Sequence, residues 1–151
     1  MNFILPNDTS PHWSLDGSVY FVTFRVANEE LTAEEQIEVL SHVKNGNEKF
    51  YTLIACIVMP DHVHVVFLAD KNCSLSTIMK GIKGVSAYRL NKMHKTKGPK
   101  WQTESFDRIV RNENELYETL VYMLNNPVDA GLTNDPWNYH GWYCNEQYWK
   151  P

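Results

Sequence analysis

Two apolar runs separated by a short breaker constrain this chain more than any other feature. Phe50–Met59 is almost entirely apolar, and His62–Leu68 follows directly after Pro60 and Asp61. Runs of this length that are rich in Val, Ile and Phe are typical of β-strands. Because so short a connection joins neighbouring strands that run in opposite directions, the pattern predicts an antiparallel β-hairpin.

Helical and extended patterns alternate on both sides of this hairpin. The resulting order, β-α-β-β-α-β-α, matches the split βαβ arrangement, an α+β, ferredoxin-like sandwich with one antiparallel sheet and helices on one face. The other sheet face would then be free for a functional site. The flanking strands are predicted over Ser18–Val26 and Phe106–Val110, and the helices over Asn28–Lys44, Leu75–Met93 and Glu113–Asn125, where Asn126-Pro127 ends the last one.

We expect residues 1–151 to form a single domain, because no repeat or Pro- and Gly-rich linker divides the chain. Residues 132–151 are rich in Trp and Tyr but lack periodicity, which predicts an irregular tail. No run approaches the roughly 18 apolar residues of a membrane span. The three cysteines form no CxxC pair and no signal-peptide pattern is present, so we expect a cytoplasmic protein without disulfides.

The charges are distributed unevenly along the chain. The net charge is −4, yet Lys71–Arg111 holds ten of the fourteen Lys and Arg side chains and only two acidic residues, a local charge of +8. Such asymmetry favours an anionic partner such as a nucleic acid. A solvated basic helix and loop would produce the same charge pattern.

His62-Val63-His64 is the most distinctive local motif. Side chains two apart on a strand share a face and lie roughly 6–7 Å apart along it, so both imidazoles can reach one divalent cation while Val63 enters the core. Asp61 is placed to orient one imidazole through its second nitrogen. Isolated pairs of this kind also occur as surface histidines or as core histidines with satisfied hydrogen bonds.

A second pair of polar residues lies on the third predicted helix. Tyr122 and Asn126 are four residues apart and therefore share one helical face. The Asn126 carbonyl oxygen is a hard ligand suited to Mg²⁺ or Mn²⁺, and the Tyr122 phenol can act as a nucleophile. The alternative is that Tyr122 packs in the core and Asn126 merely ends the helix before Pro127.

Three segments in order carry a family resemblance: MPDHVHVVF (Met59–Phe67), WQTESFDRIVRNENEL (Trp101–Leu116) and YMLNNPVDAGL (Tyr122–Leu132). Together they resemble the single-tyrosine HUH transposases, most closely the REP-associated tyrosine transposases among the IS200-like members. The opening segment Leu5–Val26 resembles that branch as well. The likeness spans nearly the whole chain and implies a ferredoxin-like fold, in agreement with the predicted strand order.

The resemblance implies a role for each of four residues. His62 and His64 fall on the HUH pair that binds the metal, and Asn126 falls on the third polar ligand of the family. Tyr122 falls on the catalytic tyrosine. Tyr117 is a competing candidate, but it lacks a polar residue four positions later.

The implied activity is to nick and rejoin single-stranded DNA at hairpins, often REP palindromes, through a 5′-phosphotyrosine formed with the help of Mg²⁺ or Mn²⁺. Relatives occur as monomers and as dimers, so the resemblance is compatible with a homodimer as well as with a monomer. A basic surface must hold the strand, and Trp101 either stacks on unpaired bases or packs in the core. The expected DNA-binding residues are Lys80, Lys83, Arg89, Lys92, Lys95, Lys97, Lys100, Trp101, Arg108 and Arg111.

Three other functions compete with this one. A domesticated DNA-binding protein would keep the fold and the basic segment but no longer cleave DNA. A ferredoxin-like RNA-binding module would carry an aromatic RNP string, which the predicted strands lack. A zinc hydrolase fits poorly, since the sequence contains no HExxH motif.

Overall fold

A computed structural model describes residues 2–3 and 17–151 of the chain. The main element is a five-stranded sheet in the order β5-β2-β4-β3-β6, in which every neighbouring pair is antiparallel. Without β6 this is the order of the split βαβ fold, so the predicted α+β, ferredoxin-like class is confirmed. The strands are β2 (Val19–Val26), β3 (Tyr51–Val58), β4 (His62–Ala69), β5 (Trp101–Val110) and β6 (Trp142–Cys144).

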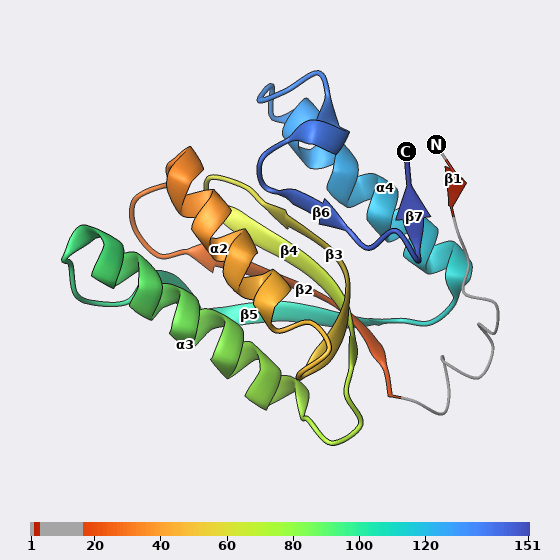
Figure 1. The fold of residues 1–151 in the computed structure, drawn as a ribbon, viewed down its shortest axis with the longest axis horizontal. Helices are drawn as coiled ribbons and strands as arrows, with labels where there is room; N and C mark the ends of the chain where they lie inside the picture. The colour runs from red at the N-terminus through yellow and green to blue at the C-terminus, as the bar shows by residue number, and fades with distance from the viewer. Residues whose placement is uncertain (1, 4–16) are drawn as a thin grey trace.

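Two helices cover one face of the sheet, as the sequence predicts (Figure 1). α2 (Ala33–Asn45) begins at Thr32, which forms a capping box with Glu35, and α3 (Leu75–His94) begins at Ser74, whose side chain accepts a hydrogen bond from the Thr77 N–H. Alternate residues of β2, β3 and β4 form a first core with the apolar sides of these helices. The central hairpin of β3 and β4 is confirmed.

The opposite face of the sheet is only partly open, although the order of predicted elements indicates a free face. α4 (Glu113–Asp129) lies there, apart from α2 and α3 and beside β6 and β7 (Figure 1). Its buried side chains, Leu116, Leu120 and Met123 among them, form a second core with β3 and the C-terminal residues. The uncovered remainder of this face lies beside α4.

The helix that carries Tyr122 and Asn126 is longer than predicted. It continues through Pro127 to Asp129, because the N–H groups of Ala130 and Leu132 still bond to the carbonyls of Asn126 and Pro127. A proline inside a helix removes one hydrogen bond, and here Pro127 is buried on the helix face that also carries the buried Met123 and Leu124. The predicted end at Asn125 is therefore wrong.

β5 starts earlier than predicted, at Trp101 instead of Phe106. The buried Trp101 indole donates a 2.9 Å hydrogen bond to Ser86 Oγ and packs edge-on against Phe24, with ring centroids 4.8 Å apart. These contacts hold the first residues of the strand against α3 and β2. The residues just before the predicted strand are therefore part of the sheet.

The C-terminal residues are also more ordered than expected. After the 3₁₀ turn η1 (Pro136–Asn138), β6 pairs with β3, and β7 (Trp149–Lys150) pairs with β1 (Asn2–Phe3). Two buried tryptophans, Trp142 and Trp149, fix this segment on the second core. The predicted irregular tail is therefore wrong in part, and the earlier part of the opening segment, Leu5–Asp16, lies outside the described residues. Within the described part of the chain no helix is long and apolar enough to cross a bilayer.

Candidate active site

The histidine pair lies at the beginning of β4. Val63 is fully buried in the first core, so His62 and His64 point to the opposite face, with ring centroids 4.7 Å apart. Pairing with β2 sets Thr23 opposite His64 and Arg25 opposite His62. Strand alternation therefore places both imidazoles on the partly open face, as the motif predicts.

His64 is buried and has one free ring nitrogen. Its Nδ1 lies 2.7 Å from Thr23 Oγ1, while its Nε2 has no hydrogen-bond partner among the described residues. Burial, together with the nearby His62, lowers the pKa of His64 to about 3, and the Asn126 side chain opposes only part of this shift. The imidazole is therefore neutral, and with Nδ1 protonated toward Thr23 its Nε2 lone pair is available.

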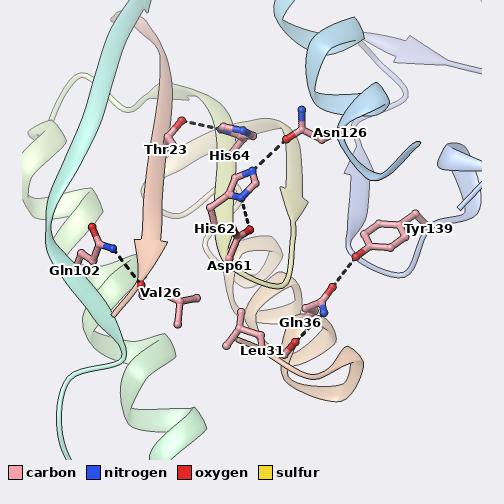
Figure 2. A network of polar contacts seen from close by, with 10 residues as sticks. All are labelled: Thr23, Val26, Leu31, Gln36, Asp61, His62, His64, Gln102, Asn126 and Tyr139. Atoms are coloured by element: carbon pink, nitrogen blue, oxygen red, sulfur yellow. Dashed lines mark hydrogen bonds and ion pairs between the residues drawn. The ribbon is translucent and has the colours of Figure 1, made fainter. Parts of the chain in front are cut away.

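His62 lies between two oxygen atoms (Figure 2). Its Nδ1 donates to Asp61 Oδ1 at 2.7 Å, and its Nε2 lies 3.1 Å from Asn126 Oδ1. Partial burial alone would raise the pKa of Asp61, but the hydrogen bond from His62 and the nearby cationic Arg25 oppose this effect, and that pKa is lowered. The ionised Asp61 thus holds the Nδ1 proton of His62 and orients this imidazole, as its position beside the motif predicts.

α4 brings the two polar residues of the helix to the histidines. Asn126 Nδ2 donates to the Tyr122 carbonyl at 3.0 Å, which turns Oδ1 toward His62. The Tyr122 ring lies 5.5 Å from the His64 ring and edge-on to Phe21, and the side chain is 55% exposed. Tyr117, the competing tyrosine, instead packs edge-on against Trp149 at 5.9 Å.

The donor atoms fit a hard divalent cation. A neutral His62 whose proton is on Nδ1 presents a lone pair at Nε2 to the lone pairs of Asn126 Oδ1, an arrangement that requires a proton or a cation between them. The unpartnered His64 Nε2 is the third donor. In the part of the chain that the structure describes, no group of three His, Cys, Asp or Glu side chains is placed to hold a metal ion, so a third ligand here would be the amide oxygen of Asn126.

Several of the expected DNA-binding residues have partners within the protein. The Lys83 ammonium donates to the carbonyls of Gln102 and Thr103 at 2.8 and 3.1 Å, and burial lowers its pKa. Arg89 pairs with Glu38 at 3.3 Å. Trp101 is buried, which fits core packing and leaves no face for a base.

The other expected DNA-binding residues are more accessible, although Arg108 also has protein contacts. The Arg108 guanidinium lies over the Phe21 ring, 4.9 Å from its centroid, and donates to Thr119 Oγ1 on α4 at 2.9 Å. Lys100 is half-buried at the start of β5. The remaining members, Lys80, Lys92, Lys95, Lys97 and Arg111, are exposed.

Sequence reasoning missed four residues on the same face. Thr23 supports His64, Arg25 lies opposite His62, and Phe21 and Phe106 lie beside them on β2 and β5. Because side chains alternate along a strand, the sequence alone puts Phe21, Thr23 and Arg25 on one face of β2. No pattern, however, reveals which of its residues pair with the histidines, because this depends on the register between strands.

Comparison with known proteins identifies the family. The sequence profile of the IS200-like transposases matches residues 22–117, about two-thirds of the chain. The chain therefore belongs to the IS200-like transposase family, whose members act on DNA. The matched residues include both histidines of β4 and end before Tyr122.

A solved structure supports the fold. A REP-associated tyrosine transposase bound to a REP hairpin aligns with a TM-score of 0.65 at 21% identity, covering 83% of this chain and 75% of that chain. A protein from Deinococcus radiodurans assigned as a transposase aligns with a TM-score of 0.49 at 22% identity, covering 71% and 88%. A search of curated proteins finds no match.

Proposed function

We propose that this protein nicks and rejoins single-stranded DNA at hairpins through a covalent bond to Tyr122. The supporting observation is the convergence of β4 and α4. Segments more than fifty residues apart bring His62 Nε2 within 3.1 Å of Asn126 Oδ1 and the His64 ring within 5.5 Å of the Tyr122 ring. A nucleophile beside a metal-ligand set is the combination that phosphoryl transfer requires.

His62, His64 and Asn126 would hold Mg²⁺ or Mn²⁺ through the three donor atoms described above. When bound, the cation withdraws charge from the phosphate of the DNA. The chain itself prepares these ligands, because Asp61 keeps a proton on His62 Nδ1 and Thr23 Oγ1 accepts a hydrogen bond from His64 Nδ1. Both imidazoles are thereby held in the tautomer that presents Nε2.

Tyr122 supplies the nucleophile. Its phenolic oxygen attacks phosphorus, an O–P bond forms, and the bond to the 3′ oxygen breaks, which gives a 5′-phosphotyrosine and a free 3′-hydroxyl. Attack by a 3′-hydroxyl on this phosphotyrosine reverses the step and rejoins the strand without an external energy source. The exposed position of Tyr122 gives a phosphate access to the phenol.

The DNA partner follows from charge and from the structural relative. The +8 segment Lys71–Arg111 forms α3, the basic loop after it and β5, and Lys80, Lys92, Lys95 and Lys97 are exposed on the helix and the loop. The aligned REP-associated transposase is bound to a REP hairpin. We infer that a DNA hairpin with unpaired flanks is also the substrate of this chain.

A denaturing gel tests the proposal. A labelled hairpin oligonucleotide with single-stranded flanks is incubated with the protein and Mg²⁺ or Mn²⁺, and the parent protein should form an adduct that survives denaturation. Tyr122→Phe should form none, because the ring without its hydroxyl keeps its packing but has no nucleophile. Tyr117→Phe is the matched control on the same helix and should form the adduct as the parent does.

Two results would reject Tyr122 as the nucleophile. An adduct that persists in Tyr122→Phe and disappears in Tyr117→Phe would assign the reaction to Tyr117. Tight hairpin binding without any adduct in the parent, at all metal concentrations, would favour the domesticated DNA-binding protein instead.

A further inference from the structure

One row of side chains extends from the histidines to the edge of the sheet. Thr23 on β2 lies directly opposite His64 on β4 and, on its other side, directly opposite Phe106 on β5. Directly opposed residues in antiparallel strands point to the same face. Phe106 therefore belongs to the face of the histidines, two strand spacings or about 10 Å from His64.

Phe106 is the most exposed of the large apolar side chains in the described chain, at 68%. Burying a phenylalanine side chain removes apolar surface from water and is favourable, so the exposed Phe106 ring could still be stabilised by a partner that covers it. A single exposed apolar residue is ordinary on a protein surface. Phe106 differs because it lies in line with the proposed nuclease site, while Trp101 on the same strand is buried.

Cationic residues lie on both sides of the row formed by His64, Thr23 and Phe106. Arg108, two residues along β5, lies opposite Phe21, and Arg25, two residues along β2 from Thr23, lies opposite His62. Both arginines are exposed. An exposed aromatic residue with an arginine on either side of it along the strands is a combination with which proteins bind single strands, because bases stack on the ring and phosphates pair with the cations.

We propose that Phe106 stacks on an unpaired base next to the phosphate that Tyr122 attacks, and so positions the single strand across β5 and β2. This inference rests on the proposed nuclease function and adds a residue that holds the substrate. The occupant is an unpaired nucleotide, because the bases of a duplex are stacked on each other and offer no free face to the ring. Arg25 and Arg108 would hold the phosphates on either side.

Binding without cleavage tests this role. All variants are made in the Tyr122→Phe protein without metal, and affinity for a hairpin oligonucleotide with single-stranded flanks is measured by fluorescence anisotropy. Phe106→Ala should weaken binding roughly 5- to 150-fold, the usual loss for one stacked base, whereas Phe106→Trp should restore it. Ile109→Ala is the matched control, since Ile109 is 44% exposed on the same strand but on the opposite face.

Abasic substitutions distinguish stacking from a general effect. Flank nucleotides are made abasic one at a time. When the base that stacks on Phe106 is missing, Phe106→Ala should cause no further loss of affinity, whereas the loss should remain at every other abasic position. The same variant should bind a blunt duplex as the parent does and should keep the parent's thermal midpoint.

Equal affinity of Phe106→Ala and parent would overturn the stacking role, as would a loss that is unchanged at every abasic position. Neither result affects the proposed nuclease function, because adduct formation by the protein with Tyr122 intact is measured separately. Conversely, stacking detected in a parent protein that forms no adduct would retain this role and reject cleavage.

Discussion

His64 is the residue whose environment most restricts its chemistry. It is 4% exposed, its Nδ1 contacts Thr23, and its ring faces both His62 and Tyr122. Burial disfavours the imidazolium form, so the native protein keeps a neutral ring at a pH where the unfolded chain takes up a proton. A neutral ring is what a metal ligand must be.

This environment predicts a pH-dependent stability. Because the pKa of His64 falls from 6.5 to about 3 on folding, the unfolded state binds more protons between these values, and stability decreases as the pH is lowered through this range. The loss is about 1.4 kcal/mol per pH unit. In metal-free urea titrations at pH 6 and pH 5, the parent should lose about 1 kcal/mol more than His64→Gln. Equal losses would show that His64 does not titrate in this way.

Residue patterns place the candidate site residues on shared faces of their elements, but they do not reveal the neighbouring side chains that hold them. The spacing of His62 and His64 places them on one strand face, and the spacing of Tyr122 and Asn126 places them on one helix face, whatever the rest of the fold is. Thr23 and Phe106 depend on the strand register, which is set by pairing between segments far apart in the sequence. No local pattern contains that information.

At the scale of elements, two of the three lysines of α3, Lys80 and Lys83, are both expected to bind DNA but have different surroundings in the structure. Lys80 is exposed, whereas the Lys83 ammonium is bonded to Gln102, Thr103 and Ser105 at the start of β5. A lysine that bridges a helix to an edge strand stabilises the fold, and an exposed lysine in a positive segment is free to contact phosphate.

The two lysines should therefore respond differently to substitution. Lys83→Met should lower the free energy of unfolding by about 1 kcal/mol, because the bonds to β5 are half exposed, and should leave the salt dependence of DNA binding nearly unchanged. Lys80→Met should keep the parent's thermal midpoint and reduce the slope of log affinity against log salt by about 1. Calorimetry and salt titrations measure the two effects, and the reverse pattern would make Lys83 the DNA contact.

Element boundaries show where sequence rules stop. The rule that a helix ends before proline failed at Pro127, which is buried on the apolar face of α4, while the N–H groups of Ala130 and Leu132 continue the hydrogen bonding. β5 was predicted too short because its first residues are held in the sheet by contacts of Trp101 with Ser86 and Phe24. These contacts join segments distant in the sequence, and no local pattern reveals them. Tertiary packing overrode local propensity in both cases, and both elements belong to the site.

At the scale of the whole molecule, the C-terminal residues connect the sheet to α4. β6 extends the sheet beside β3, Trp149 packs against Tyr117 of α4, and Tyr139 donates a 2.7 Å hydrogen bond to Gln36 of α2. These contacts join both sides of the sheet through one segment. The position of α4, and with it that of Tyr122, thus depends on residues that contribute nothing to the chemistry.

Because α4 folds onto its own sheet, one chain contains all the proposed catalytic groups. The Tyr122 ring lies 5.5 Å from the His64 ring of the same chain. We therefore expect no complementation: a mixture of Tyr122→Phe and His64→Ala proteins, each inactive alone, should form no adduct with a hairpin oligonucleotide. Adduct yield of the parent should rise in proportion to protein concentration at saturating DNA.

A restored adduct in the mixture would contradict this expectation. It would mean that Tyr122 of one copy reaches the histidines of another, as in a homodimer that exchanges its α4 helices. Mixing each variant with the parent is the control, because it shows that neither variant inhibits the reaction by itself. The outcome decides whether the closed arrangement of α4 on its own sheet is the one in which the protein acts.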